Sequence, residues 1–329
     1  MSSGGLPKAR LARMHDVMAG HVERGDVPGV VTLVSRRGEV HVDAIGTREA
    51  GGSDPIRHDT IFRISSLTKP ITAVATMILV GECRLRLDEP VDRLLPELAD
   101  RKVLTRLDGP LDDTVPANRP ITVRDLLTLR MGVGFILEPG GYPILQVANE
   151  RQVAPGPPNQ AIPQAPDEWI RRVATLPLMR QPGEAWMYGT ALSALGVLIA
   201  RASGQPSETF FRRPNLRAAR HDRHRLQRAD GEARPARGLL SGQSRHPLRR
   251  RRVLRRSPAF PDGAGGLVST IDDYLAFGQM MLRQGKPGKE RLLSRPSVQL
   301  MTTDHLTPEQ RGASTIFLGT TAAGGSACP

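Results

Sequence analysis

The apolar run ITAVATMILVGE, residues 71–82, constrains the fold of this chain more than any other feature. It predicts a helix that is apolar on most of its sides. Such a helix has to be covered by other elements, so it is expected to be buried in the middle of a domain. Further helices are predicted at 122–130 and 190–203, and the second of these is followed by Gly204, a residue suited to closing a helix. The middle of the chain is therefore expected to be mostly helical.

The N-terminal part of the chain predicts a sheet. Residues 29–46, GVVTLVSRRGEVHVDAIG, hold two runs rich in β-branched residues around a polar turn with Gly38, which predicts an antiparallel hairpin. Before the hairpin, residues 8–24 place apolar side chains at helical spacing, and Gly25 follows as an expected cap. We therefore expect an amphipathic helix followed by a two-stranded hairpin.

The remaining segments differ in their periodicity. Residues 136–166 are rich in Pro, Gly, Gln and Asn and have no usable period, which predicts a long loop. From residue 266 onward helical periodicity returns, and Thr270 and Asp273 form a predicted capping box at the start of that helix.

The positive charge of the chain is concentrated in one segment. The net charge is +13 at pH 7, and residues 212–256 account for all of it, because they hold 16 arginines, no lysine and three acidic residues. Charge alone would allow a basic arm that binds nucleic acid. The segment has no aromatic residues between its arginines and no folded module to present it, so nucleic acid is not the favoured partner.

The two cysteines, Cys83 and Cys328, are too few for a disulfide framework and lack the spacing of metal ligands. The N-terminus lacks the apolar core of a signal peptide, and no apolar run reaches membrane-spanning length. The sequence therefore predicts a soluble, cytoplasmic protein with no metal, no cofactor and no membrane partner. It does not predict the oligomeric state.

Ser66-Leu67-Thr68-Lys69 forms an S-x-x-K motif just before the apolar helix. Three residues apart on a first helical turn, the hydroxyl and the amine lie on one face, so the amine can hold or take the serine proton. The positive end of the helix would lie near a developing oxyanion. A serine at a helix start is also a common N-cap, so spacing alone leaves both interpretations open. The chain has no G-x-S-x-G motif, which excludes a nucleophile elbow.

Tyr188 precedes the helix at 190–203, and taken alone it could be a core tyrosine with a hydrogen-bonded hydroxyl. Its place in an ordered set of motifs favours a functional role. Four stretches in this order resemble the β-lactamase-like serine hydrolases, the family of class C β-lactamases, low-molecular-weight penicillin-binding proteins and family VIII carboxylesterases. They are FRISSLTKPITAVATMILVGECRLRLDEPV, PITVRDLLTLRMGVGF, PGEAWMYGTALSALGVLIARASGQP and GAGGLVSTIDDYLAFGQMMLRQGK.

The resemblance covers roughly residues 10–211 and 257–318 and implies an α+β fold. This fold is a β-lactamase-like α/β/α three-layer sandwich, built from both ends of the chain, with an inserted all-helical lobe at about 66–205 and the active site between the two parts. We expect a tail at 1–9 and one catalytic domain at 10–329.

The resemblance also implies roles for individual residues. Ser66 would be the acylated nucleophile, Lys69 its base partner, and Tyr188 the general base or acid that moves the leaving-group proton. Thr190 stands where penicillin-recognising members commonly have Asn, which favours an esterase over a true β-lactamase. The expected substrate is a small ester, or less favourably an amide or a β-lactam. The alternative function is a non-catalytic remnant or a basic nucleic-acid-binding protein.

Two segments have the composition of a shifted reading frame. Arg217 to Leu226 can be encoded by bases that, read one base later, give A-P-L-G-M-T-D-T-G, close to the turn expected there in the family. Residues 319–324 can similarly encode D-N-R-G-W-G. We therefore expect 212–256 to be aberrant and disordered, the closing strands and the third active-site element after about 318 to be missing, and the chain as written to be poorly folded and nearly inactive.

Overall fold

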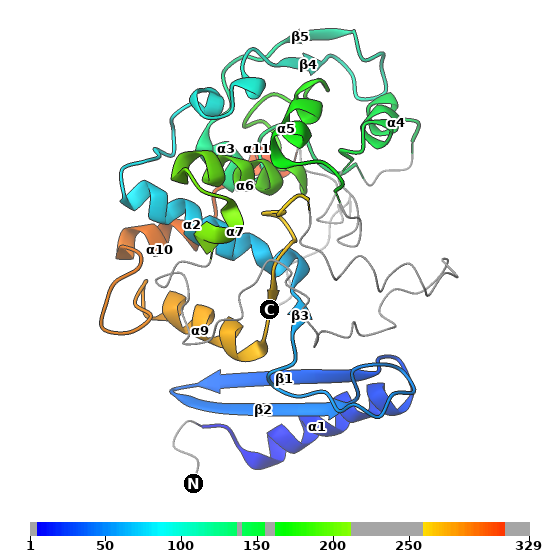
Figure 1. The fold of residues 1–329 in the computed structure, drawn as a ribbon, viewed down its shortest axis with the longest axis vertical. Helices are drawn as coiled ribbons and strands as arrows, with labels where there is room; N and C mark the ends of the chain where they lie inside the picture. Colours follow the sequence, from blue (N-terminus) through cyan, green and yellow to red (C-terminus); the bar gives the residue numbers. More distant parts are fainter. Residues whose placement is uncertain (1–4, 137–139, 155–161, 212–258, 313–329) are drawn as a thin grey trace. The chain divides into compact units, whose positions relative to one another are not determined.

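The structure is a computed structural model of the 329-residue chain, and it describes residues 5–136, 140–154, 162–211 and 259–312 (Figure 1). These residues form two compact units. The described part of Met1–Ile64, together with Leu267–Arg291, makes the first unit. The described parts of Ser65–Arg213, Pro258–Gly266 and Leu292–Pro329 make the second.

The first unit contains the predicted hairpin. Strands β1 (Gly29–Arg36) and β2 (Glu39–Gly46) pair antiparallel along their whole length. The turn between them is Arg37 and Gly38, both with positive φ, 49° and 84°. Two central residues with positive φ match the right-handed twist of the flanking strands, which explains why a glycine stands in this turn.

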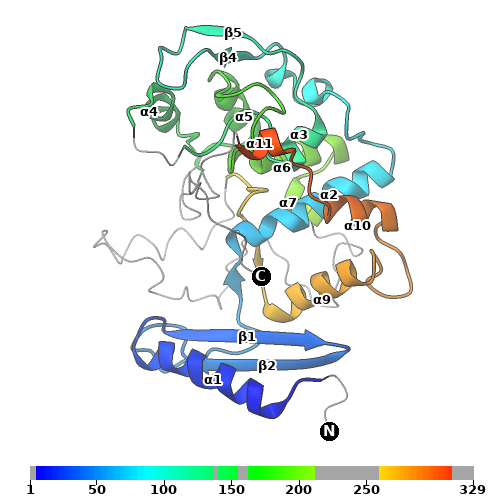
Figure 2. The same cartoon turned by 180° about the vertical axis from the view of Figure 1, so that it is seen from behind.

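Helix α1 (Lys8–Glu23) lies along this hairpin in both views (Figure 1, Figure 2). Its predicted apolar side chains are all half-buried: Leu11, Met14, Met18 and Val22. Gly25 follows with φ 74°, in the left-handed region expected of a residue just past a helix end. The helix predicted at 8–24 is therefore confirmed.

The rest of the first unit begins with a short antiparallel pair, β3 (Phe62–Arg63) and β6 (Val268–Ser269), and continues into helix α9 (Ile271–Leu282). The Thr270 hydroxyl accepts a hydrogen bond from the Asp273 N–H at 3.2 Å, as predicted for the N-cap. The reciprocal half of the predicted capping box is wrong, because the buried Asp273 carboxylate has no hydrogen-bond partner among the residues that the structure describes.

The second unit is built around two helices that pack against each other, α2 (Thr68–Gly81) and α6 (Thr190–Ser203). Most residues of both helices are buried, as the apolar run at 71–82 predicts for α2. Gly204 closes α6 with φ 69°, as predicted. The other elements of this unit are β4 (Lys102–Leu104), β5 (Thr114–Pro116), α3 (Val123–Leu127), α4 (Pro143–Glu150), α5 (Pro166–Ala174), α7 (Ser207–Phe211), α10 (Arg295–Met301) and α11 (Pro308–Gly312).

Two sequence predictions need correction here. The helix predicted at 122–130 is only α3, because the chain leaves the helical region at Leu129, which has φ 59°. The loop predicted at 136–166 contains α4, whose residues Ile144 and Ala148 are one turn apart and buried. A helix of eight residues gives too short a period to stand out among its prolines and glycines.

The fold is α+β, as predicted. Residues 212–256 and the residues after 318, which carry the predictions of an aberrant segment and of missing closing strands, lie outside the described residues. In the part of the chain that the structure describes, no helix is both long and apolar enough to cross a membrane.

Candidate active site

Ser66 and Lys69 lie at the start of the buried helix of the second unit. Ser66 belongs to a short 3-10 turn, Ser65–Leu67, that leads directly into α2, and its side chain is exposed. Lys69 lies on the first turn of α2 and is half-buried. Its Nζ donates a hydrogen bond to Ser66 Oγ at 3.2 Å. The hydroxyl is therefore accessible from solvent while the amine beside it is held against the protein.

Tyr188 reaches the same serine from a distant part of the sequence. Its Oη donates a hydrogen bond to Ser66 Oγ at 2.5 Å, although the two residues are 122 positions apart. The backbone around Tyr188 is held on both sides, because its carbonyl accepts from Phe135 N–H at 2.8 Å and Met187 N–H donates to Leu129 O at 2.8 Å. Ser66 Oγ thus accepts from two side chains.

A glycine allows this close approach of two backbone segments. A Cβ at Gly134 would lie 2.6 Å from Tyr188 O, so no other residue fits there without moving the segment. After Tyr188, Gly189 has φ 123° and ψ −98° and caps α6. The tyrosine therefore sits in a tight connection between a loop and a buried helix, where its backbone has little freedom.

The ammonium of Lys69 has two further partners. Its Nζ donates to the backbone carbonyl of Ala264 at 2.8 Å, and it lies 4.4 Å from the centre of the Tyr188 ring. A cation over an aromatic face is attracted by the negative face of the ring. The lysine is thus fixed from three directions, by Ser66, Ala264 and Tyr188.

The surroundings of Tyr188 change the acidity of its hydroxyl. Partial burial raises the pKa of Tyr188, but the polar contacts with Lys69 and Ser66 and the positive charge of Lys69 outweigh it, so that the pKa lies below its ordinary value. The tyrosinate form is therefore easier to reach here than in water. A tyrosine that loses its proton more readily can serve as a proton acceptor.

Apolar and polar neighbours complete the site around Tyr188. Phe135 stacks on its ring at 6.0 Å between centroids, and Trp186 lies tilted at 5.8 Å. Thr190, the residue that replaces the common Asn, is buried on the first turn of α6, and within the described part of the chain its hydroxyl has no hydrogen-bond partner. Two aromatic rings thus lie beside the ring of Tyr188.

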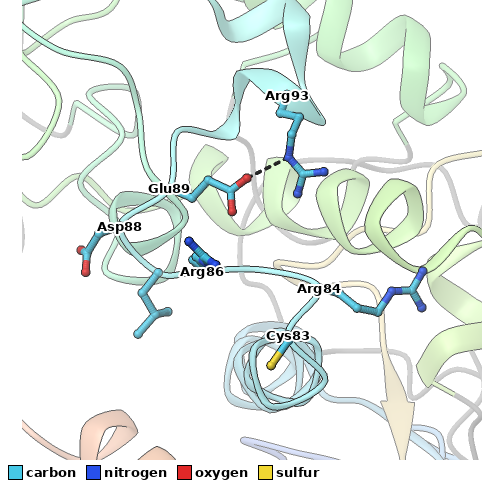
Figure 3. Close-up of a pocket in the computed structure, with 7 residues that line it drawn as sticks. Cys83, Arg84, Arg86, Asp88, Glu89 and Arg93 are labelled. Atoms are coloured by element: carbon cyan, nitrogen blue, oxygen red, sulfur yellow. Dashed lines mark hydrogen bonds and ion pairs between the residues drawn. The ribbon is translucent and has the colours of Figure 1, made fainter.

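A pocket in the described part of the second unit contains none of these residues. It has a volume of about 670 Å³ and is lined by Cys83, Arg84, Arg86, Leu87, Asp88, Glu89 and Arg93 (Figure 3). Its carboxylates are already engaged, since Glu89 accepts from Arg93 at 2.8 Å and Asp88 from Arg124 at 2.6 Å. No group of three His, Cys, Asp or Glu among the described residues could hold a metal ion.

Sequence reasoning identified the three converging side chains but not the carbonyl of Ala264. A main-chain acceptor has no side-chain signature. The available signal was the glycine-rich stretch DGAGG at 262–266, because closely spaced glycines mark places where backbone segments approach each other.

Comparison with known families and proteins gives a consistent result. The family described as Beta-lactamase matches residues 14–322. Protein Rv1367c of Mycobacterium tuberculosis is 37% identical over 310 residues, which are 90% of this chain and 72% of that protein. Esterase EstB of Burkholderia gladioli is 31% identical over 285 residues, which are 80% of this chain and 68% of the esterase.

Solved structures show the same fold at lower identity. EstCE1, a hydrolase with promiscuous acyltransferase activity, superposes with a TM-score of 0.71 at 23% identity, covering 92% of this chain and 79% of EstCE1. A penicillin-binding protein homologue from Pyrococcus abyssi superposes with a TM-score of 0.62 at 24% identity, covering 89% of this chain and 60% of that chain. At these identities the structural similarity establishes the fold, which is β-lactamase-like.

Proposed function

The chain belongs to the Beta-lactamase family, and from this premise we propose that it is a serine hydrolase that cleaves small esters through an acyl-enzyme on Ser66. The observation that supports this proposal is the convergence of Lys69 Nζ and Tyr188 Oη on Ser66 Oγ, at 3.2 and 2.5 Å. A nucleophile within hydrogen-bond reach of a base that is itself oriented by a third group is the arrangement that covalent catalysis needs.

The first half of the proposed reaction acylates Ser66. When Tyr188 or Lys69 has lost its proton, that group accepts the Ser66 hydroxyl proton while Oγ attacks the ester carbonyl carbon. The carbonyl oxygen becomes an oxyanion near the N-terminal end of α2, where the helix dipole is positive. The tetrahedral intermediate collapses, the C–O bond of the ester breaks, and the alcohol leaves with a proton from Tyr188.

The second half releases the acid. Water takes the place of the alcohol, and Tyr188, now deprotonated, accepts a proton from it as the water oxygen attacks the acyl carbonyl. Collapse of the second tetrahedral intermediate returns the proton to Ser66 Oγ and frees the carboxylic acid. An alcohol in place of water would give acyl transfer, an activity named for the relative EstCE1.

The substrate class follows from Thr190. In this position Asn is common in penicillin-recognising members, and Thr cannot offer the amide group, so an ester is favoured over a β-lactam or another amide. Comparing turnover of a p-nitrophenyl ester with that of a chromogenic cephalosporin tests this choice. Faster cephalosporin turnover would contradict it.

The experiment that tests the assignment of Ser66 is burst kinetics with p-nitrophenyl butyrate. Ser66→Ala should abolish the burst and lower kcat by about three or more orders of magnitude. The matched control is Ser35→Ala, which replaces an exposed serine in β1. It should leave the burst and kcat unchanged. Equal activity in the wild-type protein and Ser66→Ala would sink the proposal.

The pH profile tests the role of Tyr188. If its tyrosinate accepts the proton, kcat/KM rises with pH as the hydroxyl ionises. Since the pKa of Tyr188 is lowered from its usual value of 10.0, this rise should be centred below that pH. In Tyr188→Phe the rise of kcat/KM with pH should be absent, and the rate should be lower by about 100- to 10,000-fold. A Tyr188→Phe variant with an unchanged profile would assign the base role to another group.

The frame-shift hypothesis stays a prediction within this proposal. It concerns 212–256 and the residues after about 318, outside the described residues. The alternative of a basic nucleic-acid-binding arm rests on the same 212–256. Resequencing the locus tests the frame-shift hypothesis. Salt-dependent DNA binding that is lost when 212–256 is deleted would support the nucleic-acid-binding arm. The absence of DNA binding at low salt would exclude that arm.

A further inference from the structure

We infer that Asp262 is a positioning residue for Lys69 and acts through the backbone carbonyl of Ala264. The inference rests on the proposed function, because Lys69 matters here as the proton partner of Ser66. Ala264 O accepts a hydrogen bond from Lys69 Nζ at 2.8 Å. This bond is shorter than the 3.2 Å bond from Nζ to Ser66 Oγ. The place of the Ala264 carbonyl therefore fixes where the ammonium lies relative to the serine.

One oxygen of Asp262 sets the path of the backbone at Ala264. Asp262 Oδ1 accepts from the Ala264 N–H at 2.9 Å, which folds the chain back over two residues. The same oxygen accepts from the Ser193 hydroxyl at 2.6 Å, and Ser193 lies on the buried helix α6. Asp262 thus ties the turn that carries the Ala264 carbonyl to the most buried helix of the unit.

Gly263 holds the other side of the same turn. Its carbonyl accepts from Thr72 Oγ1 at 2.7 Å, so Lys69 and Thr72, on one face of α2, bind two consecutive carbonyls of the turn. A Cβ at Gly263 would lie 2.5 Å from Leu192 O on α6, so the turn is pressed directly against that helix. Within this arrangement the Asp262 side chain joins the turn to α6, because its Oδ1 binds both the Ala264 N–H and the Ser193 hydroxyl.

The hydrogen bonds of Asp262 suggest a matched pair of variants. Both side-chain bonds use Oδ1, and no hydrogen bond to Oδ2 is found among the described residues. Asp262→Asn therefore keeps an Oδ1 acceptor for both bonds, while it removes the charge and puts an amide NH2 in the place of Oδ2. Asp262→Ala removes the acceptor and frees the Ala264 N–H. Ser193→Ala removes one of the two bonds and is a milder test should Asp262→Ala fail to fold.

Steady-state hydrolysis of p-nitrophenyl butyrate by the full chain is the first measurement. Asp262→Ala should lower kcat by about 10- to 100-fold with little change in KM, since a displaced catalytic group slows the chemical step. Asp262→Asn should restore activity close to wild type, and Ser193→Ala should fall between them. Equal losses in Asp262→Asn and Asp262→Ala would overturn the inference, because they would assign the effect to charge and not to the hydrogen bonds of Oδ1.

Chemical labelling of Lys69 gives a second readout that does not depend on hydrolysis. Limited acetylation with acetic anhydride, followed by peptide mass spectrometry, compares Lys69 with the exposed Lys102 in the same sample. In Asp262→Ala, Lys69 should react several-fold faster relative to Lys102, and in Asp262→Asn it should not. If the acetylation rate of Lys69 relative to Lys102 is the same in Asp262→Ala as in the wild-type protein, the positioning role is overturned. If Ser66→Ala kept its activity while Lys69 labelling rose in Asp262→Ala, the proposed function would fail and the positioning role would stand.

Discussion

Helices α1 and α6 are similar in length but differ in their surroundings. In α1, which has 16 residues, no residue is buried, whereas in α6, which has 14, most residues are buried. Helix α1 covers one face of a two-stranded hairpin whose own residues are at most half-buried. Helix α6 packs against α2, α3, α5 and α7 within its unit.

The candidate site lies on the more closely packed of the two units. The groups of the site all lie next to the helices α2 and α6. The start of α2 carries Ser66 and Lys69, and Lys69 binds the carbonyl of Ala264. Tyr188 stands just before α6. A catalytic arrangement has to hold its atoms within a fraction of an ångström, which side chains on a closely packed scaffold can do. We therefore expect truncation of the buried side chains of the second unit to cost more free energy of unfolding than truncation of the exposed side chains of the first.

The largest expected effect comes from a matched pair of leucines. Leu198 on α6 is fully buried, and Leu282 at the end of α9 is 82% exposed. Leu198→Ala should lower the free energy of unfolding by about 2–5 kcal/mol, because it leaves a cavity as well as removing buried apolar surface. Leu282→Ala should change it by no more than about 0.5 kcal/mol.

Urea denaturation of both leucine variants measures the contrast. Comparable losses in the two would contradict the difference in burial, since they would mean that the end of α9 is covered in solution. A loss confined to Leu198→Ala would agree with it.

A buried carboxylate gives the next effect, and it depends on pH. Asp125 on α3 is 2% exposed and accepts from Arg119 at 2.6 and 3.0 Å and from the Thr122 N–H and hydroxyl. Burial raises the pKa of Asp125, but the Arg119 and Thr122 hydrogen bonds and the Arg119 charge outweigh it and hold the pKa below its ordinary value. A carboxyl whose pKa is lower in the folded state stabilises the fold above the pKa of the unfolded chain and loses this contribution as the pH falls through the folded pKa.

Asp125→Asn should therefore lower the free energy of unfolding by about 1–3 kcal/mol at pH 7. Thermal melting at pH 7 and near pH 3 measures the difference in Tm from wild type, which should shrink at the lower pH. Asp54→Asn in the first unit is the control, because Asp54 is 48% exposed and its ion pair with Arg48 should contribute about 0–1 kcal/mol. A pH-independent difference for Asp125→Asn would contradict the lowered pKa.

The same contrast explains which parts of the molecule were predictable from the sequence. The hairpin and α1 have local signals, the glycine at position 38 and apolar residues at helical spacing, and both predictions were confirmed. Ser66 and Lys69 are three residues apart, so local geometry brings them together. Their meeting with Tyr188 spans 122 positions, and no local pattern encodes such a contact, so only the resemblance to a family pointed to it.

Other features had no usable signal. Ala264 contributes a main-chain carbonyl, which any residue could supply, and α4 is too short for its period to stand out. The Asp273 carboxylate, for which the described residues supply no hydrogen-bond partner, departs from the expected capping box. A sequence motif fixes which groups are near a helix end but not which bonds they form.

The smallest change in the free energy of unfolding is expected for a Gly→Ala substitution made once in each unit. The change should be negative in the first unit and positive in the second. Gly38 in the hairpin turn has φ 84°, and a Cβ there would meet nothing within 4 Å, so strain in the left-handed region is the only cost of Gly38→Ala. That strain should lower the free energy of unfolding by about 1 kcal/mol. Gly81, the last residue of α2, has equally open space and lies in a helix, so Gly81→Ala should raise it by about 0.4–1 kcal/mol, because alanine restricts the unfolded chain. Urea midpoints of the two variants, measured side by side, should move in opposite directions, and two shifts of the same sign would show that backbone conformation does not decide these positions.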